Sequence, residues 1–532
     1  MELPGPAGVS IINSLLPMLP QADDSWTLFE AAHLLNRAGF GGSPAEIKTF
    51  HSLGRKKAVD SLLDPSEPID AIAPPEWTKP EAAAEIFNEY REVIQAAREK
   101  AKGLPPEQAA QVRRQATKAA QRKRNEMGLE AQGWWFRKIL ITQAPLREKM
   151  TLFWHDHFAT SFQKVKQPAL LMHQNELFRK NACGNFRELT KAIAVDPAMM
   201  LYLDSQNSKK GAPNENFARE VMELFTLGEG NYTEDDIKEA ARAFTGNSIN
   251  RRNVTVTFRA NQWDEGKKKI FGQTGAFKSE DVIDLIFQQK AAASYLPAKL
   301  WEYFVSENPP QAAVDALATS FKAADFNVAP LLREIFLSKE FYSDRVIRNQ
   351  IKPPVQFLVQ MLKQLEVSEP PAGFPLQAQR ELGQQLFSPP NVAGWDWGKA
   401  WINTNTLLTR YNLAGYLTKG AEASGSAELQ GGDDMAMMDE GGKKGGGMRQ
   451  GMRASKSWKG PNYKKITPPE LRENPADLVD SLIFRFFQGT LPEKARGSFV
   501  EYATAKQGVI FTDKEVAELA HLILSTPCYQ LS

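Results

Sequence analysis

Apolar residues recur at helical spacing through most of the chain. Residues 26–62 show this spacing up to the sequence RAGFGGSP, which predicts a helix that stops at the glycines and a second helix that begins at Pro44. Residues 80–128 are rich in Ala, Glu, Gln, Lys and Arg and contain the turn GLPPEQ, which together predict a long helical hairpin. Helical spacing continues through residues 133–246 and 280–365. The pattern predicts a large multi-helical body.

Strand-like alternation is confined to one region. The stretch NVTVTFRA at 253–260 alternates between apolar and polar residues, and KKKIFGQTG at 267–275 is its expected partner in one small hairpin. Residues 421–460 contain ten glycines and five methionines, which indicates a flexible insert without a core. We therefore predict an all-α fold with one small β-hairpin and a flexible Gly/Met-rich insert. The predicted parts are an N-terminal extension at 1–25, a helical core at 26–420 with the hairpin insert 80–128 and a centre at 145–246, the insert at 421–460, and a C-terminal helical segment at 461–532.

Composition and charge narrow the class of protein. The chain has 532 residues, of which 42% are hydrophobic and 24% charged, and these values exclude an intrinsically disordered protein. The 65 Lys and Arg residues nearly balance the 63 Asp and Glu residues, and the net charge of +2 gives no general attraction to nucleic acid. The second arm of the predicted hairpin is basic, but without interleaved aromatic residues we interpret it as a solvated surface. No nucleic-acid partner is expected.

Three features bear on the compartment. Cys183 and Cys528 are the only cysteines, which excludes a disulfide framework and a Cys-rich zinc site. The apolar part of the N-terminus is interrupted by Pro17 and Pro20 and has no positive region before it, so it does not resemble a signal peptide. No run of about 18 apolar residues occurs, so no membrane span is expected. These features predict a cytoplasmic protein.

Two histidines lie close together in PLREKMTLFWHDHFATS, residues 145–161. A regular helix places His155 and His157 about 160° apart, so both can bind one metal ion only if the helix ends near Trp154. The alternative is that His157 is a hydrogen-bonded core histidine and His155 lies near the surface. His173, on the next predicted helix, is close enough in sequence to join a metal site.

A stripe of polar residues follows the predicted helical hairpin at 211–246. Four of them fall within about 100° of one another on the first helix: Asn216, Arg219, Glu220 and Glu223. On an exposed face, Arg219 forms ordinary ion pairs with carboxylates four residues away. If the stripe faces inward, the carboxylates need a metal ion, a histidine or an arginine to offset their desolvation. Both interpretations stay open.

Tryptophans cluster in SPPNVAGWDWGKAWINTNTLLTRYN, residues 388–412. The side chains of Trp395, Trp397 and Trp401 form either a platform that stacks on sugar rings or bases, or a set that packs a loop against the core. Asn403 supplies a polar group beside them. This loop is the candidate ligand platform.

Taken together, several stretches resemble a large bacterial family known as domain of unknown function 1800, from about residue 26 to 415. The resemblance rests on HLLNRAGFGGSPAEI, PLREKMTLFWHDHFATS, GNFRELTKAIAVDPAMMLYLD, APNENFAREVMELFTLGEGNYTEDDIKEAARAFTG and SPPNVAGWDWGKAWINT. It implies a mostly helical bacterial protein without an established activity. Family members often carry a signal peptide, so export is the alternative to a cytoplasmic location. They are often encoded beside a sulfatase-like protein, which is the partner that the resemblance suggests.

The chain departs from the family pattern at two places. The family's tryptophan after the Thr-Gly of the second motif is Asn247 here, and its His-Asp before the Gly-x-Lys segment is Trp263-Asp264. A family site that relies on that histidine is therefore altered in this chain.

Two functional hypotheses follow. The first is a metal-assisted hydrolase in which a carboxylate such as Asp156 acts as the base on water bound to a divalent metal ion. Its metal ligands are drawn from His155, His157, His173 and Glu223, and its catalytic residues from Asp156, Glu220 and Arg219. The second is a non-enzymatic scaffold in which these groups form a buried polar network, while the tryptophan loop docks a partner or a glycan.

Overall fold

The structure, a computed structural model, describes residues 19–64, 72–250, 255–423, 458–489, 491–506 and 511–532. The predicted N-terminal extension up to residue 18 lies outside the described residues, as do residues 424–457 of the predicted Gly/Met-rich insert.

The described chain is an all-α body with small β-hairpins, which confirms the predicted fold class. The first helices are α1 (Leu28–Ala38), α2 (Pro44–Leu53), α3 (Arg55–Leu63), α4 (Pro80–Lys100), α5 (Pro106–Ile141), α6 (Pro145–His157), α7 (Phe162–Val165), α8 (Pro168–Lys180), α9 (Phe186–Ala194), α10 (Pro197–Tyr202), α11 (Glu215–Glu220) and α12 (Glu234–Ala243). The later helices are α13 (Ser279–Phe287), α14 (Lys290–Phe304), α15 (Gln311–Ala323), α16 (Val328–Leu337), α17 (Pro354–Gln364), α18 (Phe374–Leu382), α19 (Thr404–Ala423), α21 (Tyr463–Ile466), α22 (Pro475–Phe487), α23 (Glu493–Ala505) and α24 (Asp513–Leu524).

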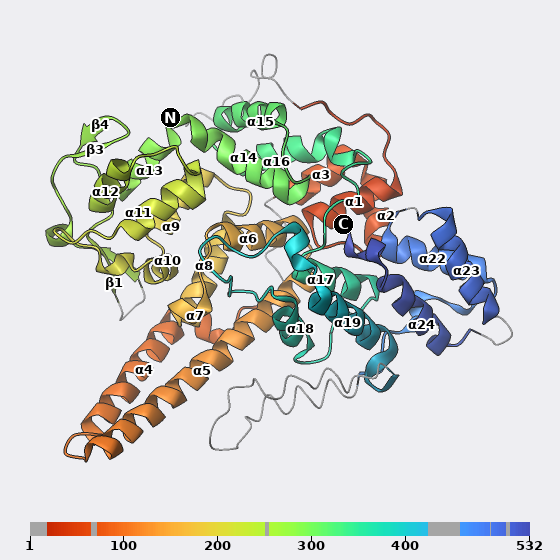
Figure 1. Ribbon diagram of the computed structural model, residues 1–532, viewed down its shortest axis with the longest axis horizontal. Helices are drawn as coiled ribbons and strands as arrows, with labels where there is room; N and C mark the ends of the chain where they lie inside the picture. The colour runs from red at the N-terminus through yellow and green to blue at the C-terminus, as the bar shows by residue number, and fades with distance from the viewer. Residues whose placement is uncertain (1–18, 65–71, 251–254, 424–457, 490, 507–510) are drawn as a thin grey trace, which may run out of the picture.

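The helices surround α6, which lies near the middle of the molecule (Figure 1). The hairpin of α4 and α5 projects from the body, and the β-strands and α22–α24 lie at opposite ends (Figure 1). One apolar core extends through the described residues from Leu19 to Tyr529. Among these residues, no helix combines the length and the apolar character needed to cross a membrane.

The strands pair differently from the prediction. Strand β1 (Asn247–Asn250) pairs with β2 (Thr255–Phe258), and β3 (Lys268–Ile270) pairs with β4 (Gln273–Gly275), both antiparallel. The predicted pairing of 253–260 with 267–275 is therefore wrong. Phe271 and Gly272, the two residues between β3 and β4, have φ angles of 48° and 78°. Two positive φ angles in a two-residue loop are typical of a tight hairpin turn, so β3 pairs with its nearest neighbour along the chain.

Local sequence signals set the helix ends. The Thr27 hydroxyl accepts the Glu30 N–H at the start of α1, and the Glu30 carboxylate accepts the Thr27 N–H in return. Ser43 and Glu46 form the same reciprocal pair ahead of α2. Such pairs satisfy backbone donors that have no partner within a helix. The predicted start of a helix at Pro44 is confirmed.

Helix α6 is buried on nearly every side, so its polar side chains must find partners inside the protein. Glu148 meets the Arg179 guanidinium of α8, with Arg179 Nη2 donating to Glu148 Oε2 at 3.0 Å. The indole N–H of Trp135 donates to the same carboxylate at 2.9 Å. Both charged side chains are only 1% exposed. This ion pair joins α6 to α8 in the interior.

We expect Glu148→Gln to lower the free energy of unfolding by about 3–5 kcal/mol, because it leaves the Arg179 charge buried without its main counter-charge. The matched control is Glu126→Gln, which removes an exposed ion pair with Arg122 and is expected to cost less than about 1 kcal/mol. Urea unfolding of the full chain measures both. Equal losses in the two variants would contradict a structural role for the buried pair.

Candidate functional site

A cleft runs along α6 and reaches the tryptophan loop. It encloses about 340 Å³ of empty space, counted with the part that is open to solvent. The residues in its wall are Lys149, Leu152 and Asp156 of α6, with Tyr303, Pro353, Gln356, Gln384, Trp395, Asp396, Trp397 and Trp401. Spacings of three and seven residues put the three α6 side chains on one face of that helix. Two predicted site features, Asp156 and the tryptophan loop, therefore share one cleft.

Lys149 is a buried cation in the cleft wall. Its ammonium donates to Gln356 Oε1 at 2.6 Å and lies over the rings of Phe40 and Tyr303, 5.0 and 5.3 Å from their centroids. Burial, with a smaller contribution from Arg37, lowers the pKa of Lys149 to about 7. Sequence reasoning missed this residue, although its seven-residue spacing from Asp156 was a usable signal.

Asp156 holds the tryptophan loop against α6. Its Oδ1 accepts the backbone N–H of Trp395 at 2.6 Å. Gly394 has a φ of 95°, and a Cβ at that position would overlap Asp156 Oδ1 and come within 2.7 Å of the Asp156 carbonyl oxygen. Burial raises the pKa of Asp156 to about 7, against the lowering effects of the Trp395 N–H and of Lys299. A carboxyl group with this pKa is suited to give or take a proton near neutral pH.

The three tryptophans have different surroundings. Trp395 and Trp401 are 7% and 4% exposed, and neither indole nitrogen has a hydrogen-bond partner within the described part of the chain. Trp397 is half-buried and stacks on Tyr303, with ring centroids 5.2 Å apart and planes at 21°. Asn403 lies outside the cleft wall; it is exposed and accepts the Thr406 N–H at the start of α19. Trp395 and Trp401 thus pack the loop against the core, which agrees with the packing interpretation, while Trp397 stays half-buried and Asn403 caps a helix.

The suggested metal ligands do not come together. Helix α6 continues through His157, so the two imidazoles point to opposite sides, and the condition for shared metal binding is not met. His155 Nε2 lies 3.0 Å from Asn175 Nδ2, His157 Nε2 lies 2.9 Å from the Phe225 carbonyl oxygen, and His173 Nε2 lies 3.0 Å from that of Thr78. No group of three His, Cys, Asp or Glu residues within the described ranges has a geometry that fits a metal ion.

The alternative interpretation, in which His157 is a hydrogen-bonded core histidine, fits the structure. Its expectation that His155 lies near the surface was wrong, because His155 is fully buried. Burial lowers the pKa of both imidazoles well below the ordinary value, with Arg179 adding to the effect at His155 and Lys299 at His157. Both rings are therefore neutral at physiological pH.

The polar stripe of α11 lies away from the cleft. Arg219 donates two hydrogen bonds to Glu234, both at 2.8 Å, and lies 3.9 Å from Glu215. Glu223 is half-buried and accepts the hydroxyl of Tyr232. Glu220 is also half-buried, and burial raises its pKa, with Glu223 adding to the effect. The stripe is therefore an ion-paired and hydrogen-bonded surface, and neither Glu220 nor Arg219 is a wall residue of the cleft.

Helix α6 nevertheless contacts the segment that carries this stripe. After Glu220 the chain continues as a π-helical turn, Val221–Leu227, whose last carbonyl groups have no partner within the turn. Tyr295 donates to the Leu224 carbonyl at 2.7 Å and Lys299 to the same oxygen at 3.3 Å, beside the His157–Phe225 contact. The segments thus meet through backbone carbonyls rather than through carboxylates.

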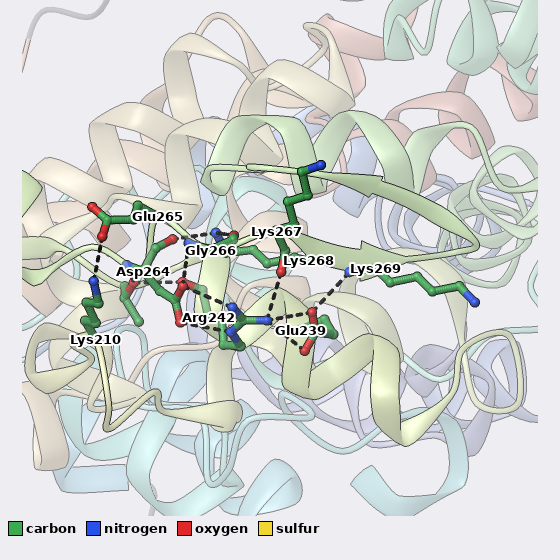
Figure 2. A network of polar contacts seen from close by, with 10 residues as sticks. Lys210, Glu239, Arg242, Asp264, Glu265, Gly266, Lys267, Lys268 and Lys269 are labelled. Carbon is green, nitrogen blue, oxygen red and sulfur yellow. Dashed lines mark hydrogen bonds and ion pairs between the residues drawn. The ribbon is translucent and has the colours of Figure 1, made fainter.

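A second polar cluster surrounds Arg242 of α12. Figure 2 shows its guanidinium between the carboxylates of Glu239 and Asp264, with donor–acceptor distances of 2.8–3.1 Å. The Lys268 ammonium donates to backbone carbonyls of the same loop and lies 4.7 Å from the Trp263 ring centroid. Asp264 therefore ties the loop before β3 to α12, and the ring of Trp263 lies beside the buried Lys268 ammonium.

Comparison with known proteins supports the resemblance seen in the sequence. The model of a family described as "Protein of unknown function (DUF1800)" matches residues 33–531, nearly the whole chain. No curated protein and no solved structure matches the chain.

The contact between Gly394 and Asp156 predicts a large effect of a single methyl group. Gly394→Ala combines a positive φ with steric overlap, whereas Gly211→Ala has a similar φ of 81° and no atom within 4 Å. We expect Gly211→Ala to cost about 1–2 kcal/mol of unfolding free energy and Gly394→Ala at least twice as much, with altered tryptophan fluorescence. Similar losses and unchanged fluorescence would show that the loop does not need close contact with Asp156.

The raised pKa of Asp156 predicts a pH-dependent effect on stability. The pKa of Asp156 in the folded protein, about 7, lies above the ordinary value of 3.8. Between pH 4 and pH 7 the folded protein therefore keeps a proton that the unfolded chain releases. As a result, the free energy of unfolding falls as the pH rises over this interval. Asp156→Asn removes this contribution, so its stability relative to wild type should rise by up to about 4 kcal/mol over that interval.

The control for this titration is Asp235→Asn, since the Asp235 side chain is 91% exposed. Denaturant unfolding at pH 4, 5, 6 and 7 gives the two difference curves. A flat curve for Asp156→Asn would contradict a carboxyl group whose ionisation is opposed by burial.

Proposed function

The chain belongs to the family of proteins of unknown function DUF1800, and from this premise we propose that it acts through the cleft along α6, as an acid–base hydrolase of hydroxylated, sugar-like ligands. The proposal does not use the suggested metal ligands, because each suggested histidine contacts a protein group and Glu223 bonds Tyr232. It keeps Asp156 and the three tryptophans as functional residues.

The observation that carries the proposal is a pair of carboxyl groups in different surroundings. Asp156 is half-buried and has a pKa of about 7, raised by burial, whereas Asp396 is exposed in the same cleft wall. Hydrolases of glycosidic bonds use such a pair. Asp156 in its protonated form gives a proton to the leaving oxygen, and Asp396 activates a water molecule or attacks the sugar carbon. The hydroxyl group of water ends on the sugar carbon, and the proton of water replaces the one that Asp156 gave.

The other walls suit a sugar. The rings of Trp397 and Tyr303 stack on each other and give an aromatic surface, which favours contact with the apolar face of a sugar ring. Gln356 and Gln384 add amide groups to the wall.

A structural role is the second candidate, and the hydrogen bonds around α6 favour it. Asp156 already binds the Trp395 N–H, and Lys149 already binds Gln356. In this role the same residues fix the packing of the loop and of α17, and the cleft turns over no substrate.

Chromogenic 4-nitrophenyl glycosides distinguish the two candidates. We expect at least one glycoside to be hydrolysed, and Asp156→Asn and Asp396→Asn to reduce kcat by about 10²–10⁴-fold, since each removes one proton-transfer or nucleophilic group. Asp235→Asn is the matched surface control and should leave kcat unchanged. Release of 4-nitrophenol is the measurement.

Two results would contradict the hydrolase proposal. One is that no glycoside in the panel is hydrolysed and no oligosaccharide on an array is retained. The other is that hydrolysis occurs and is unaffected by Asp156→Asn. Either result leaves the structural role as the better account of the cleft.

A further inference from the structure

Two buried cations, Lys149 in the cleft wall and Arg37 outside it, have no ion-pair partner among the described residues. Lys149 is 4% exposed, and among the described residues no carboxylate lies within ion-pair distance of its ammonium. Arg37 of α1 is 2% exposed and lies near enough to lower the pKa of Lys149. Its Nη2 donates to the Val346 carbonyl at 2.8 Å, while its Nε and Nη1 atoms have no partner in the described part of the chain. Burying like charges together is unfavourable unless an anion compensates them.

Neutral donors line the same cleft. The indole nitrogens of Trp395 and Trp401 are buried and have no acceptor among the described residues, although both side chains belong to the cleft wall. A buried N–H without an acceptor costs about 1–3 kcal/mol. An oxygen-rich group placed in the cleft would supply the acceptors that these two donors lack.

We propose that the Lys149 end of the cleft binds an oxyanion group of the ligand, with the Lys149 ammonium as counter-charge and the indole N–H groups of Trp395 and Trp401 as neutral donors. This inference rests on the proposed function and names its substrate class: a hydroxylated ligand that carries a carboxylate, phosphate or sulfate group. These groups share the chemistry that the cleft offers, a negative charge spread over several acceptor oxygens.

The acidic groups of the cleft are compatible with this arrangement. Seven residues of helix separate Lys149 from Asp156, which is roughly 10 Å along the axis at 1.5 Å per residue. The proposed oxyanion site and the Asp156 carboxyl group are therefore separated along the cleft. Asp396 is exposed to water, which screens its repulsion. A bound anion also favours the protonated form of Asp156, which is the form that donates a proton.

The test uses the full-length Asp156→Asn protein, which removes the proposed acid and with it any turnover. Inorganic sulfate, inorganic phosphate and acetate are titrated separately by calorimetry at pH 6, with chloride used to hold the ionic strength constant. We expect saturable binding of at least one oxyanion. Comparison of the three titrations shows whether the site prefers a sulfate, a phosphate or a carboxylate group. Lys149→Met in this background should weaken that binding by about tenfold or more, because it removes the counter-charge.

Two further variants make the result specific. Trp401→Phe keeps an aromatic ring but removes its N–H, and should weaken binding by about threefold or more. Trp263→Phe is the matched control, since the Trp263 indole nitrogen is also buried without a partner but lies outside the cleft. Lys149→Met is expected to fold, because it removes a buried charge that Arg37 repels, and an unchanged or higher melting temperature confirms this.

Binding of none of the three anions would overturn the inference, and so would binding that Lys149→Met leaves unchanged. These outcomes are separate from the fate of the hydrolase proposal. Glycoside hydrolysis that depends on Asp156 without oxyanion binding leaves the proposed function standing and removes this inference. Oxyanion binding that depends on Lys149 without hydrolysis supports the binding site and removes the acid–base reaction.

Discussion

The burial of α6 is the constraint on which the rest of the structure depends. This helix runs through the middle of the body, where its polar side chains are buried or half-buried, so they need partners inside the protein. The contacts are Glu148 with Arg179 of α8, Lys149 with Gln356 of α17, His155 with Asn175 of α8, Asp156 with the Trp395 N–H, and His157 with the Phe225 carbonyl. These contacts attach α8, α17, the tryptophan loop and the π-helical turn to one axis.

The same helix contains both structural and candidate functional groups, and the difference lies in how completely each is satisfied. Glu148 has a full counter-charge in Arg179, and the imidazole of His157 is neutral and hydrogen-bonded. Lys149 and Asp156 have hydrogen-bond partners but no ion-pair partner within the described part of the chain, and both have a pKa of about 7 because burial opposes their charged forms. The charges of Lys149 and Asp156 are only partly compensated by their neighbours. For this reason their face of α6 is the one suited to proton transfer near neutral pH.

The outcome of the site prediction follows from the fact that local sequence does not show which neighbours a side chain meets in the folded protein. Asp156 was identified as a candidate because it is a carboxylate beside two histidines, and the tryptophans because they cluster in one loop. Lys149 was missed because a lysine in a helix is ordinarily solvent-exposed, and its helical spacing from Asp156 does not reveal that α17 and Phe40 enclose it. The suggested metal ligands lie apart because their convergence required α6 to end near Trp154, whereas the helix continues to His157 and directs the two imidazoles to different neighbours.

The sequence by itself determined the helical class, the helix starts at residues such as Thr27 and Pro44, and the family, because these depend on local hydrogen bonds and on spacing along the chain. It did not determine the strand pairing, since β3 turned back at Phe271 and Gly272 rather than reaching the earlier segment. Only the tertiary structure decided that Lys149, Asp156 and Trp395 share a cleft while the α11 stripe lies elsewhere. The physical reason is that burial and charge compensation depend on neighbours far away in sequence, which local patterns do not specify.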